Sequence, residues 1–259
     1  MKHQALRQLL LSARRKLLQL HYRAGVGHLG PNLSALDILI ILFNTIMKSD
    51  DRFVLSKGHA AGSLYVALWT RGLLSDDDLN TFCCDNSLLA GHPHGSLPSV
   101  CFPTGSLGHG PSLACGMAMA AKHKRSDRHI WCLCGDGEWQ EGSCWEALSF
   151  ASHHKLKNIT IIIDVNGLQG FGSTEQVNSF GDFAARLESF GAEVVTADGH
   201  DPVAVRQALS EKPIQFPKVI LMRTIKGKGL SNQGEVSSHY LPLSKDEYES
   251  LMAQEEADA

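Results

Sequence analysis

One carboxylate stands between two glycines in the stretch GDGEWQEG, residues 135–142, which follows the apolar run IWCLC and precedes a helix-like segment. Glycine lets the backbone approach a ligand closely, and the free N–H groups at a helix start attract anions. A phosphate would fit this turn, but Asp136 would face it with a like charge. A divalent cation between the two resolves that conflict, so the stretch predicts a metal-bridged phosphate.

GDG also occurs in ordinary turns, so further ligands must come from elsewhere in the chain. Asn166 lies 30 residues after Asp136, a separation that fits one strand–helix–strand crossover. Both side chains would then lie at the carboxyl ends of neighbouring strands. A carboxylate, a carboxamide oxygen and a backbone carbonyl form a partial set of hard oxygen ligands for Mg²⁺ or Ca²⁺. For an isolated Asn-Gly pair a plain turn is the better interpretation, and the spacing favours the metal site instead.

Five apolar runs separated by helical patterns predict the elements that position these residues. The expected strands are residues 52–55, 129–134, 158–165, 192–196 and 217–224. Continuous apolar strands alternating with helices indicate an α/β fold, a parallel sheet with helices on both faces. Ligands bind beyond the carboxyl ends of such strands. The segments there are SKGH, GDG, NGLQG, DGH and IKGKG, so glycine, histidine, acid and lysine are expected at one edge of the sheet.

Composition limits the class of protein. The 259 residues are 43% hydrophobic, which suits a single globular domain over residues 1–259, with an acidic end, 253–259, that we expect to be disordered. A net charge of −3 provides no basic surface for nucleic acid. No apolar run is expected to be long enough to cross a bilayer, so we expect no membrane contact.

The cysteines and the N-terminus bear on location. Seven cysteines without a C-x-x-C pair indicate reduced, buried side chains in a cytoplasmic protein. Residues 1–36 carry several basic residues and no acid, as an organellar transit peptide would. Leucines at helical spacing over residues 6–20 favour a helix of the domain itself.

The segment GDGEWQEGSCWEALSFASHHKLKNITIIIDVNGLQ resembles the thiamine diphosphate fingerprint of transketolases. Further segments resemble that family in the same order: GHLGPNLSALDIL (27–39), SKGHAAGSLYVAL (56–68), GHPHGSLP (91–98), TGSLGHG (104–110), ADGHDP (197–202) and IKGKG (225–229). The resemblance implies a thiamine diphosphate-binding fold with Mg²⁺, or Ca²⁺ or Mn²⁺, as the bridging ion.

The resemblance also implies residue roles. Asp136, Asn166 and the carbonyl of Leu168 would hold the metal ion, Gly137 would approach the diphosphate, and Lys226 would lie near its charge. The other residues that the resemblance places near the cofactor are Gly105, Ser106 and Leu107 along its rings, His59, and Glu141, which couples two active sites across an interface.

Thirteen histidines are present, and most of them, including His21, are interpreted as surface or core residues. His28, His59, His92 and His239 lie in family segments and form the expected catalytic set. Ketol transfer needs protons to move in both directions, which suits groups whose pKa lies near the working pH. The cofactor supplies the electron sink.

Whole transketolases carry further domains, so the resemblance implies an N-terminal subunit of a split enzyme. A C-terminal subunit would bring the glutamate that engages the aminopyrimidine ring, with two copies of each chain and sugar phosphates as substrates. Some residues depart from the family pattern, which points to unusual substrate choice: Leu29, Cys101, His109, Gly170, Phe171 and Gly172. The alternatives are a subunit of another thiamine enzyme, such as a 2-oxo acid dehydrogenase, and a cofactor-binding module without catalysis.

Overall fold

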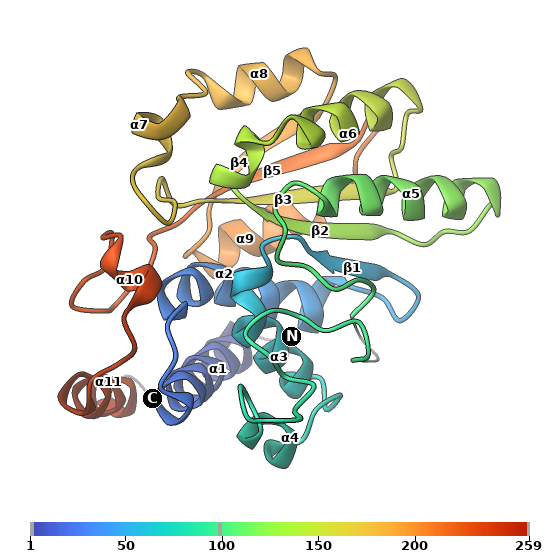
Figure 1. Cartoon of the computed structure of the whole chain (residues 1–259). Helices are drawn as coiled ribbons and strands as arrows, with labels where there is room; N and C mark the ends of the chain where they lie inside the picture. The colour runs from blue at the N-terminus through green and yellow to red at the C-terminus, as the bar shows by residue number, and fades with distance from the viewer. Residues whose placement is uncertain (1–2, 98–99, 258–259) are drawn as a thin grey trace.

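The computed structural model of the chain describes residues 3–97 and 100–257. Its centre is a five-stranded sheet in the order β1-β2-β3-β5-β4, with every neighbouring pair parallel (Figure 1). The strands are β1 Arg52–Leu55, β2 Ile130–Gly135, β3 Ile159–Val165, β4 Glu193–Asp198 and β5 Lys218–Arg223. The predicted α/β fold and all five predicted strands are confirmed, with small differences at the strand ends.

Helices precede and connect the strands. The longer ones are α1 His3–Ala24, α2 Leu29–Ile41, α3 Ala61–Thr70, α5 Gly110–His123, α6 Gly142–His153, α8 Phe183–Ser189, α9 Pro202–Ser210 and α11 Lys245–Ala257. The short ones are α4 Asp76–Asn80, α7 Thr174–Asn178, α10 Ser237–Tyr240, a π-helical turn η1 Leu42–Ile46, and two 3₁₀ turns, η2 Gly58–Ala60 and η3 Gly137–Gln140.

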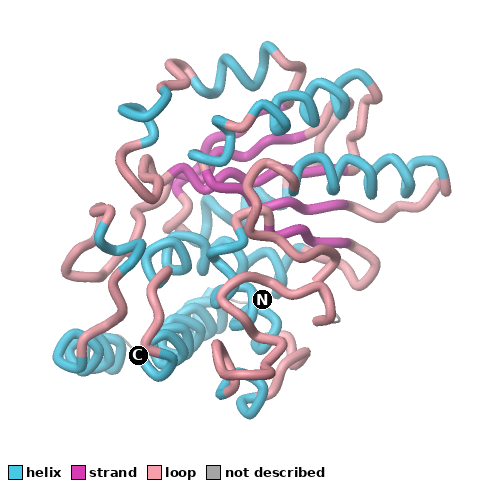
Figure 2. Tube along the Cα trace, in the orientation of Figure 1, coloured by secondary structure: helices cyan, strands magenta, loops and turns pink. Residues whose placement is uncertain are grey.

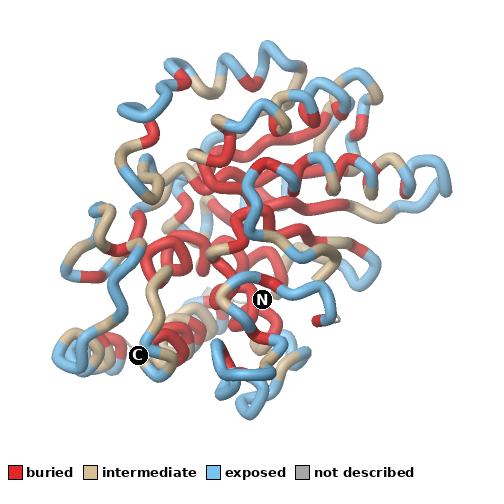
Figure 3. Tube along the Cα trace, in the orientation of Figure 1, coloured by how far each residue is buried: buried red, intermediate tan, exposed pale blue. Residues whose placement is uncertain are grey.

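The helices form two layers with the sheet between them, and the strands β1, β2, β3 and β5 are buried together with α2 (Figures 2 and 3). Alternate residues of a strand face opposite sides of the sheet. Leu133 and Ile162 belong to a core shared with α1, α2, α3 and α9, whereas Cys132 and Ile161 belong to one shared with α5, α6 and α8. Because both faces are covered, the strands are apolar throughout, which is why the sequence showed continuous runs.

The segment Leu29–Ile46 corrects the expectation that no apolar run is long enough to cross a membrane. Among the described residues it is the one helical stretch that passes by length and composition, with a mean hydropathy of 1.5. However, 78% of it is buried inside the fold. The residues of α2 belong to the core beside α1, α3 and α9, so this apolarity is that of a central core helix.

The acidic end of the chain is also different from the expectation. Residues 253–257, predicted to be disordered, form the last turns of α11, and residues 258–259 lie outside the described part. Glu255 is buried and pairs with the guanidinium of Arg14 on α1. This ion pair and the packing of Leu251 hold the helix against α1, and neither can be recognised from an acidic composition.

The cysteines follow the prediction in part. Cys115, Cys132, Cys134 and Cys144 are buried, and all seven thiols are free. Cys83 and Cys84 are exposed and Cys101 is half-buried, because they lie in the long connection between α4 and α5 and not in a strand or core helix.

Candidate functional site

A cavity of about 330 Å³ lies beyond the carboxyl ends of β1, β2, β3 and β5. Each of these strands is followed by a residue that lines it: His59 after β1, Asp136 after β2, Asn166 after β3 and Lys226 after β5. The predicted gathering of polar residues at this edge is therefore found for four strands. The segment after β4 is the exception: the ring of His200 accepts a hydrogen bond from the backbone N–H of Ile225 at 2.9 Å and does not line the cavity.

Asp136 is the most perturbed acid of the site. It is 3% exposed, and its two carboxylate oxygens accept hydrogen bonds from the backbone N–H groups of Gly137, at 2.8 Å, and Gly167, at 2.7 Å. Burial raises the pKa of Asp136 to about 6, and the charge of nearby Asp164 adds to this effect. Two amide donors thus do not compensate the charge fully, and a cation beside this carboxylate would.

The turn around Asp136 differs in detail from the sequence interpretation. Asp136 precedes the short turn η3, and the longer helix α6 begins only at Gly142. The backbone of Gly137 does not have positive φ. Glycine is needed there for space, since a Cβ atom at Gly137 would lie 2.7 Å from the side chain of Gln169.

Asn166 and Leu168 supply the other oxygens that the sequence predicted. The side-chain oxygen of Asn166 accepts a hydrogen bond from the N–H of Leu168 at 3.1 Å, which fixes the turn after β3. In the described part of the chain, no group of three or more His, Cys, Asp or Glu side chains could hold a metal ion. A metal ion at this cavity would therefore need the amide and carbonyl oxygens beside Asp136, which suits a hard cation.

Lys226 brings a positive charge to the same place. Its ammonium group donates to the carbonyls of Leu168, at 3.3 Å, and Gln169, at 3.4 Å. Burial lowers the pKa of Lys226 to about 8, and the charge of Lys57 lowers it further. An anion bound in the cavity would reverse both effects, so the site is arranged for a negatively charged ligand.

Below the cavity lies a buried ion pair that the sequence reasoning missed. Lys57, which follows β1 and lines the cavity, pairs with Asp164 on β3, and both are at most 1% exposed. Ser34 on α2 and Thr224 after β5 donate to the same carboxylate. The pair thus joins β1, β3, β5 and α2 under the site.

Glu138 was also missed. It is buried and accepts hydrogen bonds from Ser56, from the N–H of Gly108 at 2.9 Å and from the N–H of Gly135 at 3.2 Å. These contacts attach the loop 104–109 to the ends of β1 and β2. The sequence offered a sign of it, since an acid directly after GDG has no solvent-facing strand or helix to occupy.

The four predicted catalytic histidines lie together at the cavity. The ring of His28 lies 5.9 Å from that of His59, 5.6 Å from that of His92 and 5.0 Å from that of His239, measured between centroids. The rings of His59 and His239 are 5.3 Å apart. These residues come from four separate segments of the chain, so the fold brings together what the sequence only suggested.

Backbone contacts hold this histidine cluster in place. The N–H of His28 donates to the carbonyl of His239 at 2.9 Å. The side-chain amide of Asn32 donates to the carbonyls of His28, at 2.7 Å, and His59, at 3.0 Å. His28 has a left-handed backbone with φ of +66°, which is rare for a residue other than glycine and accompanies functional positions.

Burial makes the clustered histidines neutral at pH 7. It lowers the pKa of His28, His59 and His92, and that of His239 to about 3. Protonation of one ring would also disfavour protonation of its neighbours. Each neutral ring keeps one donor and one acceptor nitrogen, as proton transfer to and from a hydroxyl requires.

Two of the predicted cofactor residues do not line the cavity. Gly105 and Leu107 do, whereas Ser106 and Glu141 do not and are exposed. The side chain of Glu141 instead lies against Gly108, where an added Cβ atom would be 2.8 Å from it.

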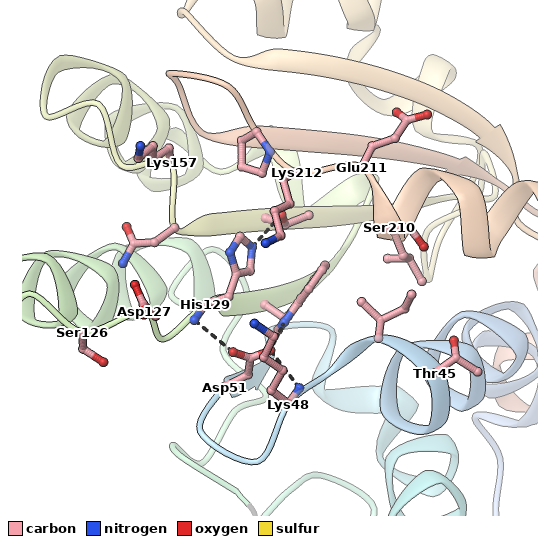
Figure 4. Close-up of a pocket in the computed structure, with 16 residues that line it drawn as sticks. Thr45, Lys48, Asp51, Ser126, Asp127, His129, Lys157, Ser210, Glu211 and Lys212 are labelled. Atoms are coloured by element: carbon pink, nitrogen blue, oxygen red, sulfur yellow. Dashed lines mark hydrogen bonds between the residues drawn. The ribbon is translucent and has the colours of Figure 1, made fainter. Parts of the chain in front are cut away.

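A larger cavity, about 500 Å³, lies at the opposite edge of the sheet and contains none of the predicted site residues (Figure 4). Its polar wall is internally paired. Asp51 accepts from the N–H groups of Lys48 and His129, each at 3.0 Å, and the ring of His129 bonds Thr160 at 2.9 Å. We therefore assign the functional site to the smaller cavity at the carboxyl edge.

The chain matches known proteins over almost its whole length. Residues 7–256 match the family model described as the transketolase thiamine diphosphate binding domain. The chain is 36% identical over 250 residues to an apulose-4-phosphate transketolase subunit from Phocaeicola vulgatus, covering 91% of this chain and 88% of that one. It is 39% identical over 245 residues to transketolase-like protein 2 from Bos taurus, covering 88% of this chain and 39% of that one.

A solved structure agrees with this. Transketolase from Campylobacter jejuni superposes with a TM-score of 0.90 at 33% identity, over 99% of this chain and 43% of that one. The chain thus spans most of one relative and about two fifths of the longer ones. The carboxyl-edge cavity accordingly lies in a domain of known cofactor class, and the chain belongs to the transketolase family, as its thiamine diphosphate binding domain.

Proposed function

We propose that the chain is the cofactor-binding subunit of a two-chain transketolase that moves a two-carbon ketol unit from a ketose to an aldose, with sugar phosphates as substrates. One observation carries the proposal: Asp136, Asn166 and Lys226, which suit a metal-bridged diphosphate, share a cavity with four clustered histidines. When bound, thiamine diphosphate supplies the electron sink for this chemistry.

In the proposal, Asp136, Asn166 and the carbonyl of Leu168 hold Mg²⁺, or Ca²⁺ or Mn²⁺. The raised pKa of Asp136 supports this, because it marks a buried carboxylate whose charge the protein alone does not balance. Gly137 would approach the diphosphate, and Lys226, which lines the same cavity, would lie near its negative charge.

The histidines hold and move protons. His28, His59, His92 and His239 are neutral at pH 7 and so can accept a proton from a substrate hydroxyl, but burial holds their pKa values below the range near the working pH that was expected from the sequence. The rings lie within about 6 Å of one another, so one bound substrate can reach several of them. His59 also belongs to the proposed cofactor contacts, with Gly105 and Leu107 along the rings, whereas Ser106 and Glu141, which are exposed outside this cavity, are proposed to face the partner side.

We propose that a partner chain completes the site. The relative from Phocaeicola vulgatus is named as one subunit of its transketolase, which supports a division between two chains. Exposed apolar side chains around the cavity favour a partner surface that covers them. Leu107, Phe171 and Tyr240 line the cavity and are 40%, 78% and 56% exposed. The partner would be a C-terminal subunit that carries the glutamate for the aminopyrimidine ring, with two copies of each chain. A cytoplasmic location stays a prediction from the sequence.

The test is ketol transfer by purified chains. The chain is assayed with thiamine diphosphate, Mg²⁺, a ketose phosphate and an aldose phosphate, alone and with its C-terminal partner. We expect turnover only with both chains, after mass spectrometry has excluded host transketolase. Decarboxylation of a 2-oxo acid in place of ketol transfer would instead support the other thiamine enzymes, and cofactor binding with no turnover would support a binding module.

A further inference from the structure

A second cavity of about 300 Å³ adjoins the histidine cluster. We call it the His21 cavity. It shares His28, His92, His239 and Tyr240 with the proposed active-site cavity, so these side chains form a common wall between the two. The rest of its lining is His21, Val26, Gly27, Asn32, Phe82, Cys83 and Gly91.

His21 was interpreted from the sequence as a surface or core histidine, and the structure places it here. The side chain is 1% exposed, and among the described residues neither ring nitrogen makes a hydrogen bond of normal geometry, although the backbone at Val26 and Gly27 lies near enough to act on its pKa. The ring packs against that of Phe82, with 5.4 Å between centroids. A buried donor and acceptor without partners is unfavourable, and such groups in native proteins usually await water or a ligand.

The fold makes room for this ring. A Cβ atom at Gly62 on α3 would lie 2.8 Å from Nε2 of His21, so glycine is required where α3 crosses it. Asn32, the other amide in the lining, is fully used: its side chain donates to the carbonyls of His28 and His59 and accepts from the N–H of Ser63 at 2.7 Å. His21 is therefore the one residue of this wall with two unpartnered ring nitrogens among the described residues, and Nδ1 of His239 is also without a partner.

The chemistry of the lining restricts the ligand. None of the described residues that line the His21 cavity is Lys, Arg, Asp or Glu. Burial lowers the pKa of His21 to about 4, against a smaller opposing effect of the backbone at Val26 and Gly27, so the ring is neutral at pH 7. Such a cavity offers no counter-charge to a phosphate. It suits a neutral group that both donates and accepts hydrogen bonds, which a hydroxyl does.

We propose that the His21 cavity receives an uncharged, hydroxyl-bearing part of the sugar substrate and that His21 determines specificity by hydrogen bonding to a hydroxyl there. This proposal rests on the proposed function for the identity of the ligand as a sugar. Any phosphate of that substrate lies outside the cavity. Val26 and Phe82 contact the apolar C–H faces of the sugar.

Kinetics of the two-chain complex tests the role of His21. We expect His21→Val to leave the melting temperature equal or higher, because an unsatisfied polar group is removed, while the KM for the ketose rises about tenfold and kcat changes less. His21→Asn, which keeps a donor and an acceptor, should recover part of the loss. His129→Val, a histidine of the opposite cavity, is the matched control. Unchanged KM values in His21→Val, with or without lost stability, would reduce His21 to a core residue.

A binding measurement separates this proposal from the proposed function. Ring signals of ¹⁵N-histidine in the full chain are followed by NMR with the neutral pentitol xylitol and with inorganic phosphate, and His21→Val identifies the signal of His21. Saturable shifts of that signal with xylitol alone are expected, and they would support the cavity even if the wild-type complex transferred no ketol unit. Shifts with phosphate alone, or with neither probe, would contradict it.

Discussion

Asp136 carries a charge that the protein balances incompletely. Its carboxylate accepts two backbone hydrogen bonds, yet burial and the neighbouring Asp164 still raise its pKa from 3.8 to about 6. That difference corresponds to about 3 kcal/mol of unfavourable interaction at neutral pH. A residue held at such a cost is understandable where a cation completes its surroundings during function.

The first prediction concerns this residue and pH. Since the pKa of Asp136 is raised in the folded state, its contribution to stability is present below about pH 4 and is lost as pH rises through 6. As pH rises over that range, the unfolding free energy of the wild type should therefore fall relative to that of Asp136→Asn. Urea unfolding without cofactor measures it. Taking the difference is necessary because the histidines titrate with the opposite sign in overlapping pH ranges.

The same variant tests the metal. Mg²⁺ with thiamine diphosphate should raise the melting temperature of the wild type, and Asp136→Asn should abolish that rise. Asp85→Asn changes an exposed acid of the α4–α5 connection and serves as the control. A cofactor affinity that is the same in Asp136→Asn as in the wild type would exclude the assignment.

The second prediction concerns the histidines. Alanine at His28, His59, His92 or His239 should reduce kcat about 100-fold or more, with the melting temperature within a few degrees of the wild type. His153→Ala, at the end of α6, is the control. Because burial lowers the pKa of all four rings, the acid limb of the pH–rate profile should lie below pH 6.5. If a variant unfolds, the histidine that it replaces has a structural role and not a catalytic one.

Residues at regular spacings were predictable, and residues that act through tertiary contacts were not. Asp136 and Asn166 could be paired because one crossover unit separates them in sequence, and β2 and β3 are indeed neighbours. His21 could not be recognised, because its unpaired nitrogens result from how α1 packs under α3. Nor could Asp164, since an acid at the end of the run ITIIIDV looks like a strand end until Lys57 is placed beside it.

Among the elements, the buried pair of Lys57 and Asp164 links the strands that form the site. Lys57 also donates to the carbonyl of Pro31 and to Ser34, both at 3.0 Å, so α2 is fastened to the end of β1. The following residues, Gly58 and His59, begin η2, and His59 lines the cavity. A change in this pair should therefore affect both stability and the placement of His59.

The third prediction follows. Lys57→Met should cost about 3–5 kcal/mol of unfolding free energy, because Asp164 would be left buried without a counter-charge. Adding Asp164→Leu should recover much of that loss. The exposed pair of Lys245 and Glu249 is the control, and Lys245→Met should cost less than about 1 kcal/mol. Urea unfolding measures all three, and equal losses in the single and double variants would show that the charge is not the cause.

Element types followed from the apolar pattern, while the ends of the chain and the short turns did not. The five strands could be predicted because both sheet faces are covered and their residues are apolar throughout. The turn η3 intervenes between β2 and α6 because Glu138 is drawn inward to Ser56 and Gly108. The tail became helical because Arg14, more than 200 residues earlier, pairs with Glu255.

At the scale of the whole molecule, the two edges of the sheet differ in what they expose. The amino edge carries a cavity in which Asp51 accepts from the backbone N–H of His129 and the ring of His129 bonds Thr160. At the carboxyl edge, an apolar rim surrounds the histidines and the predicted metal ligands. Phe171, in the segment that departs from the family pattern, is 78% exposed and lines the cavity. An aromatic ring so placed is a natural anchor for a partner chain.

The fourth prediction tests that surface. Phe171→Glu should weaken association with the C-terminal partner at least about tenfold, because a charge would have to be buried without a counter-charge. Ile214→Glu is the matched control, an equally apolar residue that is 86% exposed beside the amino-edge cavity. Titration of the partner by calorimetry measures affinity, and native mass spectrometry should show two copies of each chain in the wild type. Equal affinities for the two variants would place the partner on another face, whereas loss of binding in both would indicate a general effect of added charge.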